Sequence, residues 1–360
     1  MTLSFYLRPL DLGAPEDLPP ASPSLAGGAR HFARIAVTWR DGGAIVAREQ
    51  LRPADLLDAL AARDPNLAIA GRQRLEGLCA PRAPFAGLAL DRPQIMGVIN
   101  VTPDSFSDGG DRFDPSQAVA AGLALAEAGA GILDVGGEST RPGAELVPEA
   151  EELHRTIPVV KALADQGHVV SIDTRHARVM AEALAAGASI INDVTALTGD
   201  AKSLEVAAGS EAFIVLMHMR GEPQTMQRDP SYDDAALDIH DYLSQRISAC
   251  EAAGIDRARL ALDPGIGFGK TVKHNLQILD RMALYHDFGC PLLLGVSRKS
   301  FIAKLSCGEA PKERLAGSLA AALAGLERGV QIIRVHDVRE TRQAIAIWDA
   351  IHGVAREHAF

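Results

Sequence analysis

The sequence has few aromatic residues, few cysteines, no excess of basic residues and no long hydrophobic run. Aromatic residues make up 4% of the 360 positions, while Ala and Gly are abundant, which favours helices that pack closely on their neighbours. The formal net charge is −10, which argues against a nucleic-acid carrier, because such a protein presents a basic face. A small anionic substrate stays compatible with this charge, because a local Arg/Lys cluster can outweigh the global balance.

The cysteines and the hydrophobic pattern bear on the compartment. Cys79, Cys250, Cys290 and Cys307 form no C-x-x-C pair and have no metal-type spacing, so we expect reduced thiols in a cytoplasmic protein. No apolar stretch reaches about 18 residues, so we expect no membrane span. The N-terminal segment has no basic region followed by an apolar core, so we expect no signal peptide.

Residues 1–91 read as a small α+β extension of unknown role. Residues 1–29 are rich in Pro, Gly and Ser and predict an extended arm or linker. Apolar residues occupy alternate positions in residues 31–40, which predicts a strand. A turn follows at Asp41, and residues 44–49 fit the second strand of a hairpin. Helical patterns are expected over 53–63 and 65–78, followed by a Pro-rich linker over 81–93. Because ionisable groups do not cluster in this extension, we expect a structural accessory.

From residue 92 to residue 360 the pattern becomes regular. Short β-rich runs alternate with Ala/Leu-rich helical segments, and eight such pairs predict a parallel (β/α)8 TIM barrel, with a doubly wound sheet as the structural alternative. The expected strands are 95–99, 131–135, 168–172, 188–191, 212–217, 259–262, 291–295 and 331–335. The expected helices are 115–129, 148–165, 175–186, 201–208, 233–253, 272–285, 311–328 and 338–351.

Polar residues follow every predicted strand. In a barrel these strand ends meet on one face, where active sites lie. A single Asp at a strand end is more often a cap or turn residue, and we assign Asp193 and Asp337 to that role. Eight consecutive polar ends are harder to explain by capping. The residues concerned are Asn100, Asp134, Glu138–Arg141, Asp173, Asn192, Met217 and His218, Asp263, Ser297–Ser300, Arg334 and His336.

These side chains divide into two chemical groups. Asp173, Asn192, Asp263 and Lys299 offer donors and acceptors that suit the edge of a flat heterocycle. The second group suits a polyanion such as pyrophosphate, because Arg binds phosphate in a fork and an amide oxygen can ligate Mg²⁺. Its members are Asn100, Thr140, Arg141, Arg334 and His336.

Three other interpretations fit less well. Residues 264–271 (PGIGFGKT) resemble the end of a nucleotide P-loop, but Pro264 replaces the first glycine and the motif follows the sixth strand. His218 has no second ligand cluster near it in sequence, so we read it as a pocket or core histidine rather than a metal ligand. A two-carboxylate glycosidase is unsupported, because these carboxylates come with Lys, Arg and an amide.

The motifs together resemble one family, dihydropteroate synthase of folate biosynthesis. They run in order from about residue 95 to 340, and the extension lies outside the match. The segments that carry the resemblance are NVTPDSFSDGG, LDVGGESTRPGA, SIDT, INDV, LMHMRGEPQTMQ, DPGIGFGK, SRKSF and IRVHDV.

The resemblance implies an activity, a cofactor and an assembly. Such enzymes join 6-hydroxymethyl-7,8-dihydropterin pyrophosphate to p-aminobenzoate with Mg²⁺, release pyrophosphate, commonly form homodimers and are the target of sulfonamides. Neither a nucleic acid nor a membrane is implied as a partner.

The resemblance also implies site residues. Asp173, Asn192, Met217, Asp263, Phe268, Lys299 and Arg334 would form the pterin pocket, with Arg334 stacked on the ring. Asn100, Arg141 and His336 would hold pyrophosphate and metal. Thr140, Pro142, Phe106 and Ser300 would border p-aminobenzoate.

The implied reaction is SN1-like. Pyrophosphate leaves first, the pterin stabilises the cation, and the aniline nitrogen attacks. Asp108, Lys299 and Arg141 are the expected catalytic residues, and residues 101–113 and 137–147 are expected to be moving lids. Two alternatives stay open: a folate-dependent methyltransferase with a corrinoid partner, and a catalytically silent paralogue.

Overall fold

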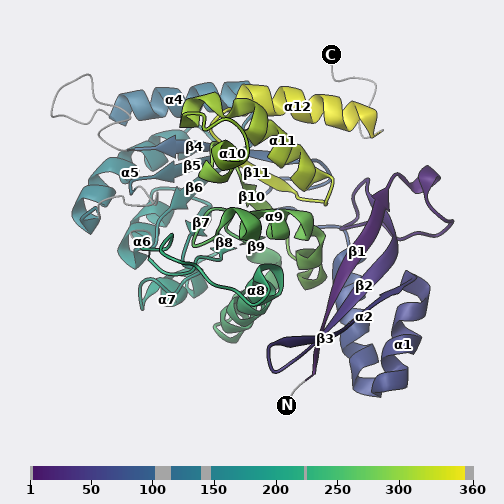
Figure 1. The fold of residues 1–360 in the computed structure, drawn as a ribbon. Coiled ribbons are helices and arrows are strands. Elements are labelled where there is room, and N and C mark those ends of the chain that lie inside the picture. Colours follow the sequence, from purple (N-terminus) through teal and green to yellow (C-terminus); the bar gives the residue numbers. More distant parts are fainter. Residues whose placement is uncertain (1–2, 102–114, 139–146, 223–224, 353–360) are drawn as a thin grey trace.

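The protein consists of a barrel and a smaller module beside it (Figure 1). The structure, a computed structural model, describes residues 3–101, 115–138, 147–222 and 225–352. Within these ranges no helix has the length and apolar character needed to cross a membrane.

Eight parallel strands form the barrel. Hydrogen bonds link them in the order β10-β11-β4-β5-β6-β7-β8-β9, and a parallel bridge between Leu262 and Leu292 joins β9 to β10. Because the ring closes, the predicted TIM barrel is confirmed and the open doubly wound sheet is excluded. The strands are β4 (Gln94–Asn100), β5 (Ile132–Gly136), β6 (Val170–Asp173), β7 (Ile190–Asp193), β8 (Phe213–Met217), β9 (Leu260–Asp263), β10 (Leu293–Gly295) and β11 (Ile332–Val335).

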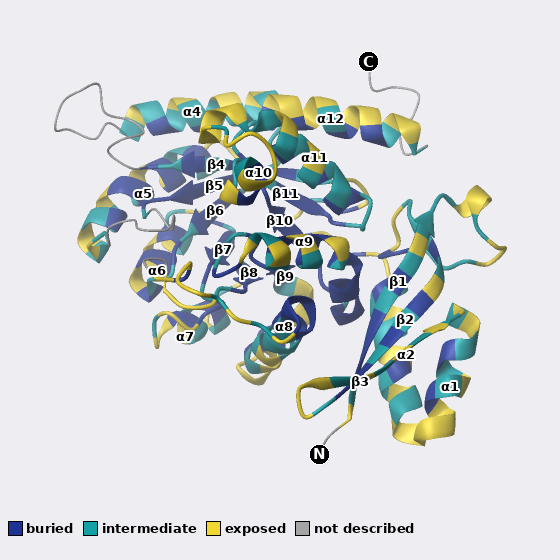
Figure 2. Cartoon of the chain, in the orientation of Figure 1, coloured by how far each residue is buried: buried dark blue, intermediate teal, exposed yellow. Residues whose placement is uncertain are grey.

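Helices surround the barrel, and their outward faces are exposed while the strands are buried (Figure 2). Local signals start two of them: Asp234 accepts from the Leu237 N–H at the start of α8, and Thr271 and His274 cap the start of α9 reciprocally. The helices are α4 (Pro115–Ala128), α5 (Glu149–Ala164), α6 (Ala177–Ala185), α7 (Ser203–Ala208), α8 (Ala235–Ala252), α9 (Val272–Asp280), α10 (Ser300–Leu305), α11 (Leu315–Leu326) and α12 (Val338–Ile351).

The helix predicted over 272–285 is wrong in its second half. It ends at Asp280, and a 3-10 helix, η4 (Met282–Phe288), follows with every residue buried. Residues 282–288 are mostly apolar and so extend the helical pattern of α9. In the structure the barrel covers this segment on one side and the module on the other, so its apolar residues are buried without being part of α9. The helix α10 was not expected, and residues 311–313 form a 3-10 turn, η5 (Pro311–Glu313), ahead of α11.

Residues 81–93 contain no helix or strand, as predicted, but they close the barrel. Phe85 is fully buried and lies edge-on to Phe213, with 5.0 Å between ring centroids. Phe85 packs among residues at or near the starts of the strands, such as Ile132, Ile190 and Ile332. This segment therefore seals the end of the barrel opposite the carboxyl ends of the strands. The domain division at residue 91 stays a prediction.

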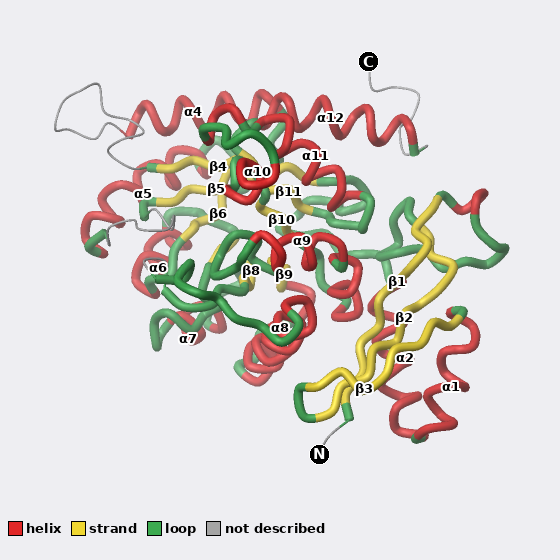
Figure 3. The backbone as a smooth tube through the Cα atoms, in the orientation of Figure 1, coloured by secondary structure: helices red, strands yellow, loops and turns green. Residues whose placement is uncertain are grey.

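The module is an antiparallel sheet covered by two helices (Figure 3). Its core joins Phe5, Phe32 and Trp39 of the sheet to Leu60 and Leu78 of the helices. The predicted hairpin and both helices are confirmed, although the first helix begins after a 3-10 turn at Pro53–Asp55. The elements are β1 (Ser4–Gly13), β2 (His31–Asp41), β3 (Ala44–Leu51), α1 (Leu56–Arg63) and α2 (Pro65–Cys79), with short 3-10 turns at Pro15–Asp17 (η1), Pro53–Asp55 (η2) and, in the barrel, Arg257–Arg259 (η3).

The prediction of an extended arm or linker over 1–29 is wrong, because residues 4–13 form the strand β1 of the module sheet. β1 pairs along its length with β2, and Phe5 and Leu7 are buried in the module. The strand tolerates Pro9 because it lies at the edge of the sheet, where a missing N–H donor costs no ladder bond. Composition averaged over the whole segment hid this strand.

Candidate active site

The carboxyl ends of the strands bring together a buried acidic and amide cluster. Asp134 of β5, Asp173 at the end of β6 and Asn192 of β7 come from three neighbouring strands. The Asn192 amide donates to both oxygens of Asp134 at 3.3 and 3.2 Å. Arg334 of β11 donates through Nε to Asp134 and through Nη2 to Asp173, both at 2.6 Å. One guanidinium therefore serves two carboxylates.

Asp134 is the residue that sequence reasoning passed over. It was noted after the second strand and assigned to neither chemical group, yet it is fully buried and contacts both Asn192 and Arg334. The available signal was a carboxylate inside an apolar run, since a charge is buried there only when it is paired.

The cluster shifts the pKa values of its members because they are buried and lie close to one another. Burial is the largest cause that raises the pKa of Asp173, to about 7; Arg334 opposes this shift and Asp134 adds to it. Burial also raises the pKa of Asp263 at the end of β9. Burial lowers the pKa of the Arg334 guanidinium, but the two carboxylates raise it by more, so Arg334 stays charged.

The glycine-rich loop after β9 forms the next wall. The Asp263 carboxylate accepts from the Gly265 N–H at 2.7 Å, and the Gly267 N–H donates to Asn275 at 2.8 Å. Gly265 has φ +70°, and a Cβ there would lie 1.9 Å from the His218 carbonyl oxygen, so only glycine fits.

Lys270 supports this loop from inside. It is 3% exposed, and its Nζ donates to the carbonyls of Phe268 (2.9 Å) and His218 (3.2 Å). Burial lowers its pKa well below the ordinary value. A lysine held by its own loop is unlike the phosphate-binding lysine of a P-loop, which supports the rejection of that motif.

His218 is buried in this wall, as expected for a pocket or core histidine. Its Nδ1 lies 3.0 Å from Lys270 Nζ, and burial, followed by the charge of Lys270, lowers its pKa to about 2. Across the described ranges no group of three His, Cys, Asp or Glu side chains is arranged to hold a metal.

Lys299 lies across the glycine-rich loop. Its Nζ is 4.1 Å from the centroid of the Phe268 ring, and a Cβ on Gly267 would lie 3.2 Å from Lys299 Cδ. Met217 is buried at the end of β8. Ser300 follows as the exposed first residue of α10. The predicted pterin-pocket residues therefore come from adjacent strand ends.

The turn before Lys299 is fixed to the end of β11. Arg298 has φ 60°, an uncommon backbone conformation for this residue type, and its guanidinium pairs with Asp337. Ser297 Oγ lies 3.0 Å from His336 Nδ1. Asp337 is structural, as predicted, but it pairs with Arg298 and its side chain does not cap α12. Asp193 is also structural: it accepts from Thr195 and Leu197 in a turn.

Several predicted residues fall outside the described part of the chain. Phe106 and Asp108 lie in 102–114, and Thr140, Arg141 and Pro142 lie in 139–146, as do most of the predicted lids. Asn100 is described as the last residue of β4. It is half-buried, and its side-chain amide makes no hydrogen bond within the described ranges.

The residues that flank 139–146 are held together. Arg175 binds the Glu138 carboxylate through two nitrogens, at 3.0 and 3.1 Å. The same carboxylate accepts from the Val147 N–H at 3.4 Å. Arg175 also lies 3.6 Å from Glu222, in the segment after β8. These bonds connect the rims of three strand-end loops.

Comparison with known proteins agrees with a pterin site at this end of the barrel. A family described as "Pterin binding enzyme" matches residues 96–336. The chain is 48% identical over 264 residues to the dihydropteroate synthase of Escherichia coli (strain K12), which covers 73% of this chain and 93% of that protein.

Two solved structures of the Xanthomonas albilineans dihydropteroate synthase are similar as well. The structure with 4-aminobenzoic acid has a TM-score of 0.71 and 48% identity, and covers 75% of this chain and 97% of its own. The structure in complex with 7,8-dihydropteroate has a TM-score of 0.67 and 45% identity, and covers 74% and 97%. Residues 3–80, which form the module, lie outside the matched family region.

Proposed function

The chain belongs to the dihydropteroate synthase family, transferases of folate biosynthesis, and we propose that its barrel joins 6-hydroxymethyl-7,8-dihydropterin pyrophosphate to p-aminobenzoate. The products are 7,8-dihydropteroate and pyrophosphate. The observation that carries the proposal is the cluster of Asp134, Asp173, Asn192 and Asp263 beside Arg334, which combines acceptors, an amide and one cation at the carboxyl end of the barrel.

The cluster suits the pterin because a flat heterocycle with ring nitrogens, an amino group and a carbonyl needs a partner for every buried polar atom. Asp173 and Asp263 supply acceptors, Asn192 supplies both kinds of group, and Lys299 supplies a donor on the opposite wall. Met217 and Phe268 provide apolar contacts, and Arg334 would stack on the ring while it stays paired to Asp134.

The pyrophosphate end of the substrate would meet Asn100, Arg141 and His336. The amide oxygen of Asn100 at the tip of β4 accepts no hydrogen bond from the described residues and fits Mg²⁺, which is bound by few protein oxygens and keeps waters and substrate phosphates as its other ligands. Bound Mg²⁺ would neutralise part of the charge on the leaving pyrophosphate. Arg141 and His336 would add donors to the same oxygens.

The reaction is proposed to be SN1-like. When the C–O bond to pyrophosphate breaks, its electrons stay with the leaving oxygen and a cation forms on the methylene carbon. The electron-rich ring and Asp108 would stabilise that cation, and the aniline nitrogen of p-aminobenzoate would then attack and lose its proton. Thr140, Pro142, Phe106 and Ser300 would border the p-aminobenzoate site, for which sulfonamides would compete.

The experiment that tests this proposal is the release of pyrophosphate in the presence of each substrate alone and of both. Release that requires p-aminobenzoate supports it. Retained pterin binding without release would favour a silent paralogue, and methyl transfer from a folate to a corrinoid partner would favour the methyltransferase.

Lys299→Ala provides a residue-level test of the pterin pocket. Loss of a charged donor to a buried ligand costs roughly 1.5–3 kcal/mol, so pterin affinity should fall about 10- to 100-fold while the fold is kept. Calorimetric titration with a pterin measures this change. Lys304→Ala, on the exposed side of α10, is the matched control. Equal pterin affinity in wild type and Lys299→Ala would rule out this role.

We also propose a homodimer that works in the cytoplasm. The support for a dimer is an apolar groove of about 580 Å³ among α9, α10 and α11, where Leu276 and Leu305 are 43% and 54% exposed. The support for the cytoplasm is that all four cysteines are free thiols, one of them the exposed Cys307.

A further inference from the structure

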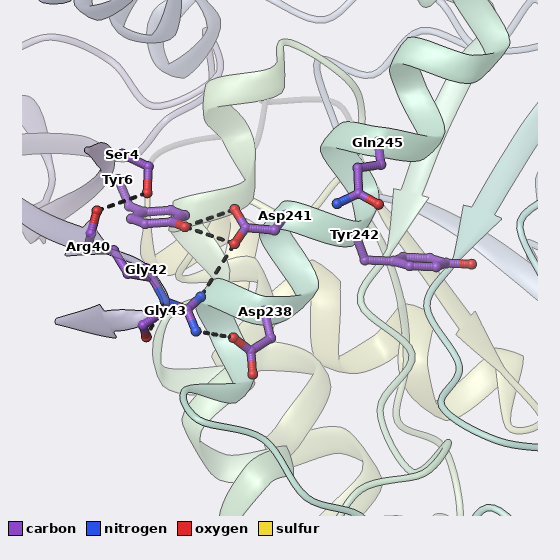
Figure 4. Close-up of a pocket in the computed structure, with 9 residues that line it drawn as sticks. All are labelled: Ser4, Tyr6, Arg40, Gly42, Gly43, Asp238, Asp241, Tyr242 and Gln245. Carbon is purple, nitrogen blue, oxygen red and sulfur yellow. Dashed lines mark hydrogen bonds and ion pairs between the residues drawn. The ribbon is translucent and has the colours of Figure 1, made fainter. Parts of the chain in front are cut away.

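The β2–β3 hairpin of the module contacts the start of α8 through one arginine. Arg40, near the end of β2, is 6% exposed although its partners lie near the surface. Its Nη2 donates to Asp238 at 2.6 Å, its Nη1 donates to Asp241 at 3.3 Å, and its Nε donates to the Gly43 carbonyl at 2.7 Å (Figure 4). The guanidinium therefore joins the hairpin turn to the first two turns of α8.

Directed polar bonds accompany apolar packing at this contact, where Tyr6 lies edge-on to His240 of α8 with 5.2 Å between ring centroids and Ile45 packs against the barrel core. A cleft of about 510 Å³ lies between the hairpin and α8, with Tyr6 and Arg40 on one side and Asp238 and Asp241 on the other (Figure 4). Tyr6 crosses it with a hydroxyl that donates to Asp241 at 2.8 Å. At this end of the junction, these directed bonds add to the apolar packing and define the orientation of α8 relative to the module.

A chain of hydrogen bonds continues from Arg40 to the glycine-rich loop. The second oxygen of Asp238 accepts from the Asp233 N–H at 3.0 Å. The preceding residue, Tyr232, donates its hydroxyl to the Gly269 carbonyl at 2.8 Å. Gly269 lies between Phe268 and Lys270, the residues that meet Lys299 and support the loop.

Removal of the Arg40 charge would disturb this chain because of the carboxylates around it. Asp238 and Asp241 bind it directly, and Asp233 lies 3.8 Å away. Without the cation these carboxylates repel one another at one helix start, and the Asp238 side chain, 22% exposed, loses its strongest partner. The segment before α8, which carries Tyr232, is then free to shift.

We propose that Arg40 is a positioning residue for the pterin pocket: through Asp238 and Tyr232, the N-terminal module holds the glycine-rich loop in place. This inference rests on the proposed function, because it assigns the module to the pterin half of the two-substrate site. It gives residues 3–80, which lie outside the matched family region, a role in that reaction.

The test compares the Michaelis constants of the two substrates in Arg40→Met. We expect KM for the pterin pyrophosphate to rise about 3- to 10-fold, the usual range for coupling through such a network, with KM for p-aminobenzoate within about 2-fold of wild type. Arg40→Lys keeps a cation and one bond, and should restore part of the loss. Arg34 lies in β2 like Arg40 and forms an exposed ion pair with Asp11 of β1, so Arg34→Met should leave both constants unchanged.

A double-mutant cycle tests the route. Tyr232→Phe removes only the hydroxyl that binds Gly269, so its effect on the pterin KM should be less than additive with Arg40→Met. Additive effects would overturn the route. Unchanged pterin KM in Arg40→Met would overturn the proposal even if the variant melts earlier. A wild-type enzyme that binds no pterin and releases no pyrophosphate would instead refute the proposed function.

Discussion

Asp134 and Asp173 share one guanidinium in a buried site, and this environment determines how the pocket responds to pH. Two buried carboxylates beside one cation leave an excess negative charge. Burial is the main cause that raises the pKa of Asp173 to about 7, and the negative charge of Asp134 adds to this shift. The pocket of the ligand-free protein is therefore expected to take up a proton near neutral pH.

This shift predicts that pterin affinity rises with pH. Below pH 7 Asp173 is protonated and accepts poorly; above it, the carboxylate accepts from the N–H donors of the ligand. The wild-type affinity should increase up to about tenfold per pH unit from pH 5 to 7 and level off near pH 8. Calorimetry in buffers of different ionisation enthalpy would measure both the affinity and the proton released.

Asp173→Asn should bind more weakly and lose this pH dependence. Asp165→Asn changes an exposed carboxylate that pairs with Lys161, and should retain the wild-type profile. A flat wild-type profile between pH 5 and 8 would contradict a raised pKa at Asp173.

The residue pattern identified polar side chains at strand ends but did not pair them. Asn192 and Arg334 were assigned to different chemical groups, yet both contact Asp134. The reason is physical: a bond between residues 200 positions apart depends on barrel closure, and no local pattern encodes it.

Among the secondary-structure elements, α2 of the module packs closely against η4 of the barrel. Gly77 lies at this contact, and a Cβ there would lie 2.3 Å from the Asp287 carbonyl oxygen. Nearby, Arg82 donates to the carbonyls of Gly77 and His286. The module therefore contacts the barrel through backbone as well as side chains.

Gly77→Ala should destabilise the protein. Steric overlap with backbone costs about 1–3 kcal/mol, more than the gain of about 1 kcal/mol in helix propensity. Equilibrium denaturation measures the difference. Gly71→Ala in the same helix meets only a terminal carbon of the Leu60 side chain, which can move, and should cost less. If Gly77→Ala and Gly71→Ala lose equal free energy of unfolding, the contact of Gly77 with η4 does not limit the stability of the protein.

The elements show where local reasoning succeeds. All eight barrel strands were located, because each is a short apolar run between helical patterns. β1 was missed because Pro and Gly around it masked ten residues of strand, and the end of α9 was missed because η4 is buried on both sides. Both errors arise from partners that are distant in the sequence.

For the whole molecule, the proposed homodimer would use the groove among α9, α10 and α11. The groove among α9, α10 and α11 exposes Leu276 and Leu305 next to Phe301 and Ile302. An exposed apolar surface of this kind marks an interaction site, which the proposed dimer would bury.

Leu305→Glu should convert the proposed dimer to a monomer, because a charge in an apolar interface is desolvated without a partner. Light scattering coupled to size exclusion measures the mass. Ile69→Glu places the same change on an exposed residue of the module and should leave the assembly intact. Identical masses for Leu305→Glu and wild type would place the interface on another face.

The sequence by itself determined the barrel, the order of its strands along the chain and the polar character of their carboxyl ends, because periodicity and strand-end residues are local properties. The tertiary structure alone decided that Asp134 joins Asp173 at one arginine, that Phe85 seals the other end, and that Arg40 of the module reaches α8. Each of these contacts joins residues more than 100 positions apart, or elements whose neighbours are set only when the barrel closes and the module docks.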